Sequence, residues 1–342
     1  MKKNLILSIE TSCDETSIAV IQNWTEVLSL EIATSIALHQ KTKWIIPEEA
    51  ARAQVDYLNP VFNDALKNAW KTIEEIDVIA VTKWPGLIWS LMAWITFANT
   101  LSFIYKKPLL WVNHIYWHIF WNLLERKAED VKFPAIILTV SWWHNEIHLM
   151  KSFNEIELIW ESLDDSAGEA FDKCWRMIWL WYPAWKDVWE LAKKWDKKAF
   201  NFPRWMIWSW DFNFSFSGLK TSVLYKIQNS EKENISWKND FLEENKNDLA
   251  ASFQEAICDI LVKKTLKAVE KFWAKQIHLA WWVSANLRLR ELFWEKIKKQ
   301  NVNLEILWPK KMVYCTDNWA MIWAAAYFQE IEGKNIVDVD MN

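Results

Sequence analysis

Residues 5–21 read Leu-Ile-Leu-Ser-Ile-Glu-Thr-Ser-Cys-Asp-Glu-Thr-Ser-Ile-Ala-Val-Ile, which is two apolar runs joined by a polar connection. The runs at 5–9 and 17–21 have the length and the branched side chains of buried β-strands. A third apolar run, at 27–32, follows the turn-forming pair Asn23-Trp24. The chain is therefore expected to open with neighbouring strands that pair antiparallel.

Strands and helices alternate through the rest of the chain. Helical spacing predicts helices at 56–69 and 91–103, and short apolar runs predict strands at 78–81 and 109–112. The second half repeats this order: strands are predicted at 135–140, 146–150, 276–280 and 304–307, helices at 248–272 and 287–299, and a polar connection at 230–246. The alternation predicts an α/β protein of two similar lobes with a cleft between them.

The composition is that of a globular protein. Of the 342 residues 52% are hydrophobic and 25% are charged, and the formal net charge is -4. This balance excludes an intrinsically disordered chain and a collagen-like repeat. No apolar run is expected to reach the ~18 residues of a membrane span, and the first residues lack a signal peptide's apolar stretch. The cysteines are scattered without a CxxC pair, so a reducing, cytoplasmic location is predicted.

Glycine is scarce in this chain and tryptophan is abundant. There are 4 glycines and 29 tryptophans, whereas glycine ordinarily makes up about 7% of a protein, or roughly 24 residues at this length. Several tryptophans stand where turns need glycine, as in Trp84-Pro85-Gly86 and the pairs Trp142-Trp143 and Trp281-Trp282. We therefore hypothesise that a codon read here as tryptophan is read as glycine in the source organism. The alternative is a genuinely tryptophan-rich protein.

His114 and His118 form an H-x-x-x-H pattern. On a helix, residues four apart lie on one face, so both imidazoles could bind one metal ion. The alternative is a pair of ordinary histidines on a helix surface. A zinc protease would carry glutamate directly after the first histidine, and Ile115 stands there instead, so that class of enzyme is disfavoured.

Two turns could bring bare backbone close to a phosphate if their tryptophans are read as glycine. Ser141-Trp142-Trp143-His144 follows one predicted strand, and the segment from Trp281 to Asn286 follows another and leads into a helix. Backbone N–H groups in such turns bind anions, above all at a helix N-terminus. The alternatives are a plain hairpin turn and a strand–helix connection in which Ser284 or Asn286 caps the helix.

Other charged groups have ordinary explanations when the sequence is taken alone. Asp317 follows a strand-like run, and an aspartate in that position most often caps a helix N-terminus. The acidic residues Asp164, Asp165, Glu169 and Asp172 would usually face solvent, and so would the lysines between 263 and 275.

Taken together, these segments resemble the tRNA N6-adenosine threonylcarbamoyltransferase family. Matches to the family's motifs lie along nearly the whole chain, at 9–16, 112–118, 141–144, 161–165, 167–173, 214–221, 283–286 and 315–318. The family has glycine where this chain has Trp84, Trp117, Trp142, Trp143, Trp160, Trp181, Trp185, Trp281, Trp282 and Trp319. A decaying gene would lose varied residues rather than one residue type to a single replacement, which favours the codon hypothesis.

The resemblance implies the actin-like ATPase fold, an α/β fold of two ribonuclease-H-like lobes with a nucleotide in the cleft. The first lobe would comprise residues 1–124 with 318–342, and the second 125–317. One divalent metal ion, iron or else zinc, would be held by the residues that match His114, His118 and Asp317. The adenine nucleotide, threonylcarbamoyl-AMP or ATP, would be bound by the matches Thr139, Val140, Ser141, Trp142, Trp143, Asp172, Trp185 and Asn286.

The implied reaction transfers the threonylcarbamoyl group from the adenylate to the N6 amine of the adenosine 3′ of the anticodon, in tRNAs that read codons beginning with A. A general base is not assigned, although Asp14 and Glu15 are candidates near the phosphates. The net charge of -4 argues against binding tRNA unaided. The family's partners, a non-catalytic paralogue and a small ATPase, would supply the missing surface. The alternatives are a small-molecule kinase of the same fold and the non-catalytic paralogue itself.

Overall fold

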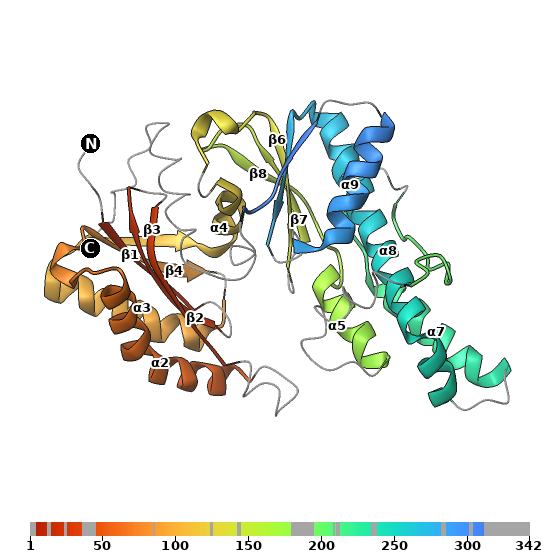
Figure 1. Ribbon diagram of the computed structural model, residues 1–342, viewed down its shortest axis with the longest axis horizontal. Coiled ribbons are helices and arrows are strands. Elements are labelled where there is room, and N and C mark those ends of the chain that lie inside the picture. The colour runs from red at the N-terminus through yellow and green to blue at the C-terminus, as the bar shows by residue number, and fades with distance from the viewer. Residues whose placement is uncertain are drawn as a thin grey trace. The chain divides into compact units, whose positions relative to one another are not determined.

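A computed structural model of the chain describes residues 5–11, 15–23, 26–35, 46–84, 86–123, 126–141, 145–178, 195–207, 209, 213–233, 238–281, 285–300 and 304–310. The chain divides into two compact units, Met1–Val131 with Pro309–Asn342 and Lys132–Trp308 (Figure 1). The sequence places the corresponding boundaries at 124/125 and 317/318. Each unit is built on its own β-sheet.

The first unit contains a five-stranded sheet in the order β3-β2-β1-β4-β5. Strands β1 (Leu5–Glu10), β2 (Glu15–Gln22) and β3 (Glu26–Thr34) pair antiparallel, as the opening of the sequence predicts. Strands β4 (Val78–Trp84) and β5 (Leu109–Asn113) extend the sheet parallel to β1. Because β1, β4 and β5 run in the same direction, their carboxyl ends meet at one edge of the sheet.

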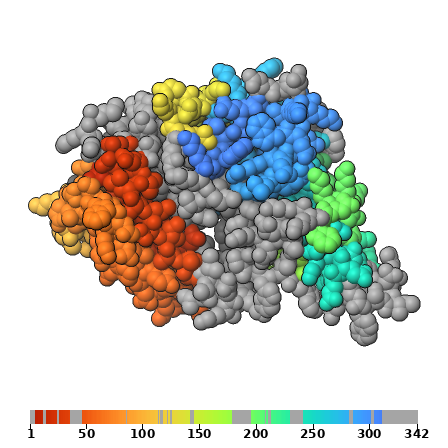
Figure 2. Space-filling model, viewed as in Figure 1, coloured from red at the N-terminus to blue at the C-terminus, as the bar shows by residue number. Residues whose placement is uncertain are grey.

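Two long helices cover one face of this sheet. Helix α2 (Pro47–Asn68) packs on β2 and β3, helix α3 (Ile88–Tyr105) packs on β1, β4 and β5, and the two helices contact each other (Figure 1). Together they form the orange surface in Figure 2. Helix α2 begins well before the predicted start at residue 56, because its first turns carry charged residues such as Glu48 and Glu49 and lack an apolar stripe.

Helix α3 corrects one expectation about the sequence. Among the described helices it is the one long and apolar enough, by length and composition, to cross a membrane, although no run of that length was expected. Its inner side chains, Leu91 and Trp94 among them, are buried against the sheet, as in the core helix of a globular unit. Its outer side chains include Met92 and Phe103, which are exposed.

The last helix described in the first unit is short and follows β5 without a loop. Helix α4 (His114–Phe120) begins at the residue after β5 ends, and a 3-10 turn, η2 (Trp121–Leu123), continues it. Two further 3-10 turns, η1 (Ile73–Glu75) and η3 (Ala128–Asp130), lie in the connections of this unit. The H-x-x-x-H pattern is therefore helical, as predicted.

The second unit repeats the sheet of the first. Its strand order is β10-β9-β6-β7-β8. Strands β6 (Ala135–Val140), β7 (Asn145–Met150) and β8 (Ile156–Glu161) pair antiparallel. Strands β9 (Gln276–Ala280) and β10 (Glu305–Leu307) continue the sheet parallel to β6. Both sheets thus share one order and one pattern of strand directions, which confirms the prediction of two similar α/β lobes.

The helices described in the second unit are α5 (Ala167–Met177), α7 (Ser217–Glu233), α8 (Lys238–Phe272) and α9 (Leu287–Gln300). Helix α8 contacts β6 and all three other helices, and it buries the predicted apolar residues Leu249, Phe253, Ile257, Ile260 and Leu261. The expected polar connection at 230–246 is wrong for most of its length. Helix α7 reaches Glu233 and α8 begins at Lys238, because neither segment contains a proline or glycine that would end a helix.

Three tryptophans occupy backbone conformations that favour glycine. Left-handed φ angles occur at Trp70 (55°), Trp273 (54°) and Trp281 (72°), and at three other non-glycine residues in the described part of the chain. Trp70 and Trp273 stand just beyond the ends of α2 and α8, and their side chains are 91% and 85% exposed. Glycine is the preferred residue at this position because it has no Cβ to strain. Glycine at these three positions would relieve the backbone strain, and the codon hypothesis itself stays a prediction.

Candidate functional site

The two predicted metal-binding imidazoles lie side by side in the first unit. His114 opens α4 at the carboxyl end of β5, and His118 follows one helical turn later. Their Nε2 atoms are 3.1 Å apart and the rings meet edge to face. Both side chains are buried, with His118 fully inaccessible to solvent. The alternative of two histidines on a helix surface is therefore wrong.

A buried carboxylate contacts the far side of the first imidazole. Glu10, the last residue of β1, places Oε2 3.2 Å from Nδ1 of His114. The same oxygen accepts a hydrogen bond of 2.6 Å from the hydroxyl of Thr82 on β4. Glu10 and Thr82 are each 1% exposed. Sequence reasoning assigned no role to either residue, although a glutamate that ends a fully buried strand is a signal, because an isolated buried charge is costly.

The donor set of the imidazole pair fits a metal ion. Two histidine nitrogens that bind one ion at about 2.1 Å lie roughly 3.0–3.4 Å apart, and the observed separation of 3.1 Å falls in that range. Imidazole nitrogens suit zinc and iron. Within the described part of the chain no group of three His, Cys, Asp or Glu side chains could hold a metal. The predicted third ligand, Asp317, lies outside those residues.

The predicted phosphate loop of the second unit joins two paired strands. Val140 pairs with Asn145, so strands β6 and β7 form a hairpin whose connection starts at Ser141. The hairpin alternative is thus right about topology, while Trp142 and Trp143 lie outside the described residues. Thr139, Val140 and Ser141 are all buried.

Two buried polar side chains beside this loop lack hydrogen-bond partners. They are the hydroxyl of Thr139 and the amide of Asn145, whose oxygen and nitrogen are both unpaired. Thr139 and Asn145 are 0% and 1% exposed, and buried polar groups are ordinarily hydrogen-bonded. Because these residues occupy successive registers of the hairpin, they lie on its two faces. The sequence did not single out Asn145, and a ligand at this end of the hairpin would satisfy it.

A second acid–base pair follows on β7. Glu146 Oε2 lies 3.4 Å from Nε2 of His148. Burial, followed by the nearby charge of Glu161, raises the pKa of Glu146 to about 7. Burial lowers the pKa of His148 to about 4. At neutral pH the imidazole is therefore uncharged, and the contact is not an ion pair.

Asp172 lies on α5 and is only 6% exposed, so the interpretation of a solvent-facing acid is wrong for this residue. Its Oδ2 lies 3.1 Å from the guanidinium of Arg176, one turn along the helix. The neighbouring acids hold α5 to the start of α7. Asp165 pairs with Lys173 and Lys220, and Asp164 accepts hydrogen bonds from the hydroxyl of Ser215 and the backbone N–H of Phe216.

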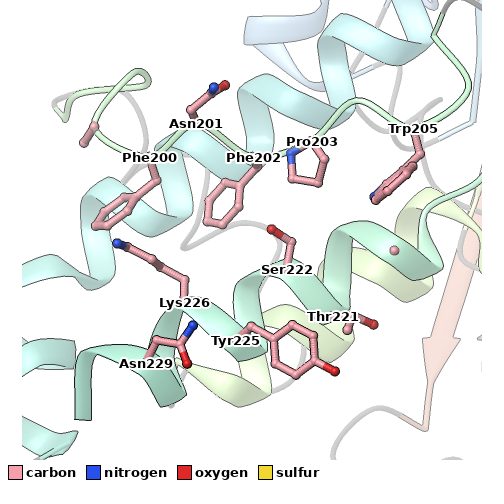
Figure 3. A pocket seen from close by; sticks show the side chains of 12 residues that line it. Phe200, Asn201, Phe202, Pro203, Trp205, Thr221, Ser222, Tyr225, Lys226 and Asn229 are labelled. Atoms are coloured by element: carbon pink, nitrogen blue, oxygen red, sulfur yellow. The ribbon is translucent and has the colours of Figure 1, made fainter. Parts of the chain in front are cut away.

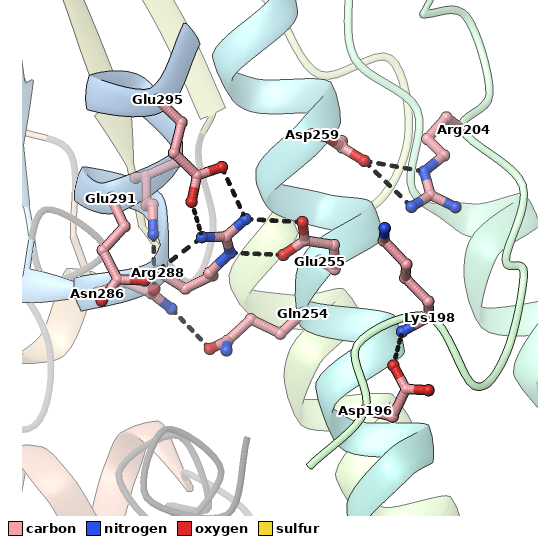
Figure 4. Close-up of polar contacts among 11 residues, drawn as sticks. Asp196, Lys198, Arg204, Gln254, Glu255, Asp259, Asn286, Arg288, Glu291 and Glu295 are labelled. Atoms are coloured by element: carbon pink, nitrogen blue, oxygen red, sulfur yellow. Dashed lines mark hydrogen bonds and ion pairs between the residues drawn. The ribbon is translucent and has the colours of Figure 1, made fainter. Parts of the chain in front are cut away.

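Asn286 caps helix α9 and is 2% exposed. Its Oδ1 accepts the backbone N–H of Leu289 at 3.0 Å, and its Nδ2 donates to Oε1 of Gln254 on α8 at 2.9 Å (Figure 4). The capping alternative is confirmed, and a role in binding substrate stays a prediction. Beside it, the guanidinium of Arg288 donates two hydrogen bonds to the carboxylate of Glu255, which joins α9 to α8.

A cavity of about 620 Å³ lies elsewhere in the second unit, between residues 199–205 and α7 (Figure 3). Its lining includes Phe200, Trp205, Gly218, Tyr225 and Lys226. None of the predicted site residues lines it. The predicted Trp185 lies outside the described residues, and so do residues 282–284.

The duplicated sheet and the buried imidazole pair first define a class of protein. The chain has the two-lobed actin-like ATPase fold. It resembles component A of (R)-2-hydroxyglutaryl-CoA dehydratase from Acidaminococcus fermentans, with a TM-score of 0.53 and 12% identity over 97% of this chain and 100% of that one. It also resembles HypF from T. kodakarensis, with a TM-score of 0.58 and 12% identity over 96% of this chain and 48% of HypF. At such identity the likeness concerns the fold alone.

Sequence comparison then identifies the family within this fold class. A family model described as tRNA N6-adenosine threonylcarbamoyltransferase (TsaD) matches residues 26–324. A protein of that name from Thermosipho africanus is 44% identical over 94% of this chain and 93% of its own length. Another from Listeria monocytogenes is 41% identical over 100% of this chain and 96% of its own length. The chain belongs to the tRNA N6-adenosine threonylcarbamoyltransferase family and is a transferase that modifies tRNA.

Proposed function

We propose that this enzyme transfers the threonylcarbamoyl group of threonylcarbamoyl-AMP to the N6 amine of the adenosine 3′ of the anticodon, in tRNAs that read codons beginning with A. The observation that carries the proposal is the buried pair His114 and His118, whose Nε2 atoms lie 3.1 Å apart at the carboxyl edge of the parallel strands. Ligands of α/β proteins bind beyond that edge. A small-molecule kinase of the same fold would not need this pair.

His114 and His118, with Asp317 as the predicted third ligand, would hold one divalent metal ion, iron or else zinc. Two imidazoles and one carboxylate leave positions open for a substrate. When bound, the ion supplies Lewis-acid stabilisation of the negative charge that develops on the attacked carbonyl. The amine of the adenosine forms the new bond to carbon and gives up one proton, and the adenylate departs with the electrons of the broken anhydride bond.

The second unit would bind the adenylate of the donor. Support comes from the β6–β7 hairpin, where Thr139 and Asn145 present buried polar groups without partners in the described structure. With glycine at positions 142 and 143, the loop between them would expose backbone N–H groups to a phosphate. Asp172 and Asn286, both buried, stay candidates for the nucleoside end of the donor.

We further propose that tRNA binding depends on partner subunits, a non-catalytic paralogue and a small ATPase. The net charge of -4 leaves little basic surface for a polyanion. The outer side of α3 exposes Ile88, Met92, Phe103 and Ile104, and an apolar patch of this kind on a helix is typical of an interaction surface. We place the paralogue there, and Phe103→Glu should weaken the association in a sedimentation measurement.

The test is transfer of labelled threonylcarbamoyl from its adenylate to unmodified tRNA, with and without the partner subunits. The enzyme is prepared with tryptophan and with glycine at the 29 tryptophan positions. We expect transfer with the glycine form and its loss in His114→Ala. The matched control is His278→Gln, which changes another buried histidine, on β9 of the second unit, and should retain transfer. Full transfer by His114→Ala would remove the imidazole pair from the mechanism.

A further inference from the structure

We propose that Glu10 is a positioning residue that fixes the tautomer and the orientation of His114. The inference rests on the proposed function, because it assigns Glu10 a purpose through the metal site. A carboxylate on one nitrogen of an imidazole directs the other nitrogen, with its lone pair, toward a metal. Here that other nitrogen is Nε2 of His114, the atom that faces His118.

The register of the parallel strands brings the three side chains together. Ser8 pairs with Ala80 and Ile9 with Val81, so the next step along β1 and β4 places Glu10 beside Thr82. Thr82 in turn pairs with Val112, two residues before His114. The contacts therefore join residues 72 and 104 positions apart along the chain. Glu10 and Thr82 lie within paired strands, and His114 follows the third strand directly at the start of α4, so no loop holds any of the three.

The chemistry of the contact decides where the proton lies on His114. An ionised carboxylate can only accept hydrogen bonds. Oε2 of Glu10 accepts one from the hydroxyl of Thr82 at 2.6 Å and faces Nδ1 of His114 at 3.2 Å. The neutral imidazole therefore carries its hydrogen on Nδ1 and keeps the lone pair on Nε2. The hydrogen bond from Thr82 anchors the same carboxylate oxygen that contacts the ring.

The test compares Glu10→Gln, which removes the charge but keeps the shape, with Thr82→Val, which removes only the anchoring hydroxyl. The matched control is Ser8→Ala, two residues earlier on β1, where a fully buried hydroxyl has no hydrogen-bond partner. Two quantities are measured. One is the Kd for Zn²⁺ in competition with a chelating dye, and the other is the pair of ring ¹⁵N chemical shifts of His114 in metal-free protein.

We expect Glu10→Gln to raise the Kd for Zn²⁺ about 10–100-fold and to mix the two tautomers of His114. Thr82→Val should raise the Kd a few-fold, and Ser8→Ala should change neither quantity. Unchanged affinity and an unchanged Nδ1–H tautomer in both site variants would overturn the inference. If the parent protein binds no Zn²⁺, the proposed metal chemistry fails. The ¹⁵N shifts then still decide whether Glu10 sets the tautomer.

Discussion

The replacement Trp70→Gly should stabilise the first unit. Trp70 follows helix α2 with φ at 55°, and two hydrogen bonds close the helix around it. Its own N–H donates to the carbonyl of Lys67 at 3.0 Å, and the N–H of Lys71 donates to the carbonyl of Leu66 at 3.0 Å. This is the Schellman arrangement, in which the residue at the left-handed position is usually glycine.

The expected gain comes from strain, because the indole of Trp70 is 91% exposed and little packing is lost with it. A side chain with a Cβ costs about 1–2 kcal/mol in the left-handed conformation. Glycine also makes the unfolded chain more flexible, and this reduces the stabilisation by about 0.4–1 kcal/mol. The free energy of unfolding should therefore rise by about 0.5–1 kcal/mol, the difference between these two effects.

The assay is urea unfolding followed by far-ultraviolet circular dichroism, which does not depend on the indole that is removed. Trp70→Ala is the matched control, because alanine keeps the Cβ and should show no gain. Trp294→Gly is the opposite control: this residue lies within helix α9, its ring packs against that of Trp308, and its replacement should be destabilising. Equal stability of Trp70→Gly and Trp70→Ala would refute the strain argument.

Three further predictions follow from the second unit. Arg288→Ala should lower the free energy of unfolding of the second unit by about 3–5 kcal/mol in urea titrations, because the buried Glu255 loses its bidentate partner. Stability should rise from pH 4 to 6.5 in Glu146→Gln and fall from pH 4.5 to 7 in His148→Gln, by up to ~3 kcal/mol each. In Glu146→Gln the remaining His148, whose pKa is lowered to about 4, loses its contribution to the free energy of unfolding as the pH falls. In His148→Gln the remaining Glu146, whose pKa is raised to about 7, loses its contribution as the pH rises toward neutral. Calorimetry across this pH range tests both signs. Gly218→Ala should stabilise less in thermal melts than the same change made beside Trp205→Gly, because the added Cβ would lie 2.5 Å from the indole nitrogen of Trp205, whereas alanine is otherwise the better helix residue.

The buried strands could be predicted closely from the sequence. The runs at 135–140 and 276–280 match β6 and β9 residue for residue. Strand β6 is a nearly continuous apolar run, as expected for a strand buried on both faces, whereas β9 alternates the apolar Ile277 and Leu279 with polar residues. Strand β8 (Ile156–Glu161) was not predicted, since every one of its residues is partly or fully exposed and its pattern is mixed. Helix α7 was missed for a similar reason, because its sequence has no clear apolar stripe.

In the candidate site, too, local features could be predicted from the sequence and contacts between distant residues could not. The spacing of His114 and His118 is local, so the sequence alone could place both imidazoles on one helical face. The contact of Glu10 with Thr82 joins residues 72 positions apart. It depends on the register of two parallel strands, and no spacing within either strand encodes that register. Partners of this kind become visible only when the strands are paired.

The energetic cost of the tryptophans can be compared with the total stability of a domain. Trp94 and Trp175 are almost fully buried, yet the N–H of each indole lacks a hydrogen-bond partner in the described structure, although buried indoles usually find one. A buried donor left unpaired costs about 1–3 kcal/mol, and left-handed tryptophans such as Trp70 and Trp281 cost about 1–2 kcal/mol each. A domain is stable by only ~5–15 kcal/mol in all. Trp70, Trp273 and Trp281 place a Cβ where a left-handed backbone favours glycine, whereas Trp94 and Trp175 lie within helices α3 and α5 and bury an indole N–H. The codon hypothesis therefore predicts that the form with glycine at these positions is the more stable one, which urea unfolding of the two forms would measure.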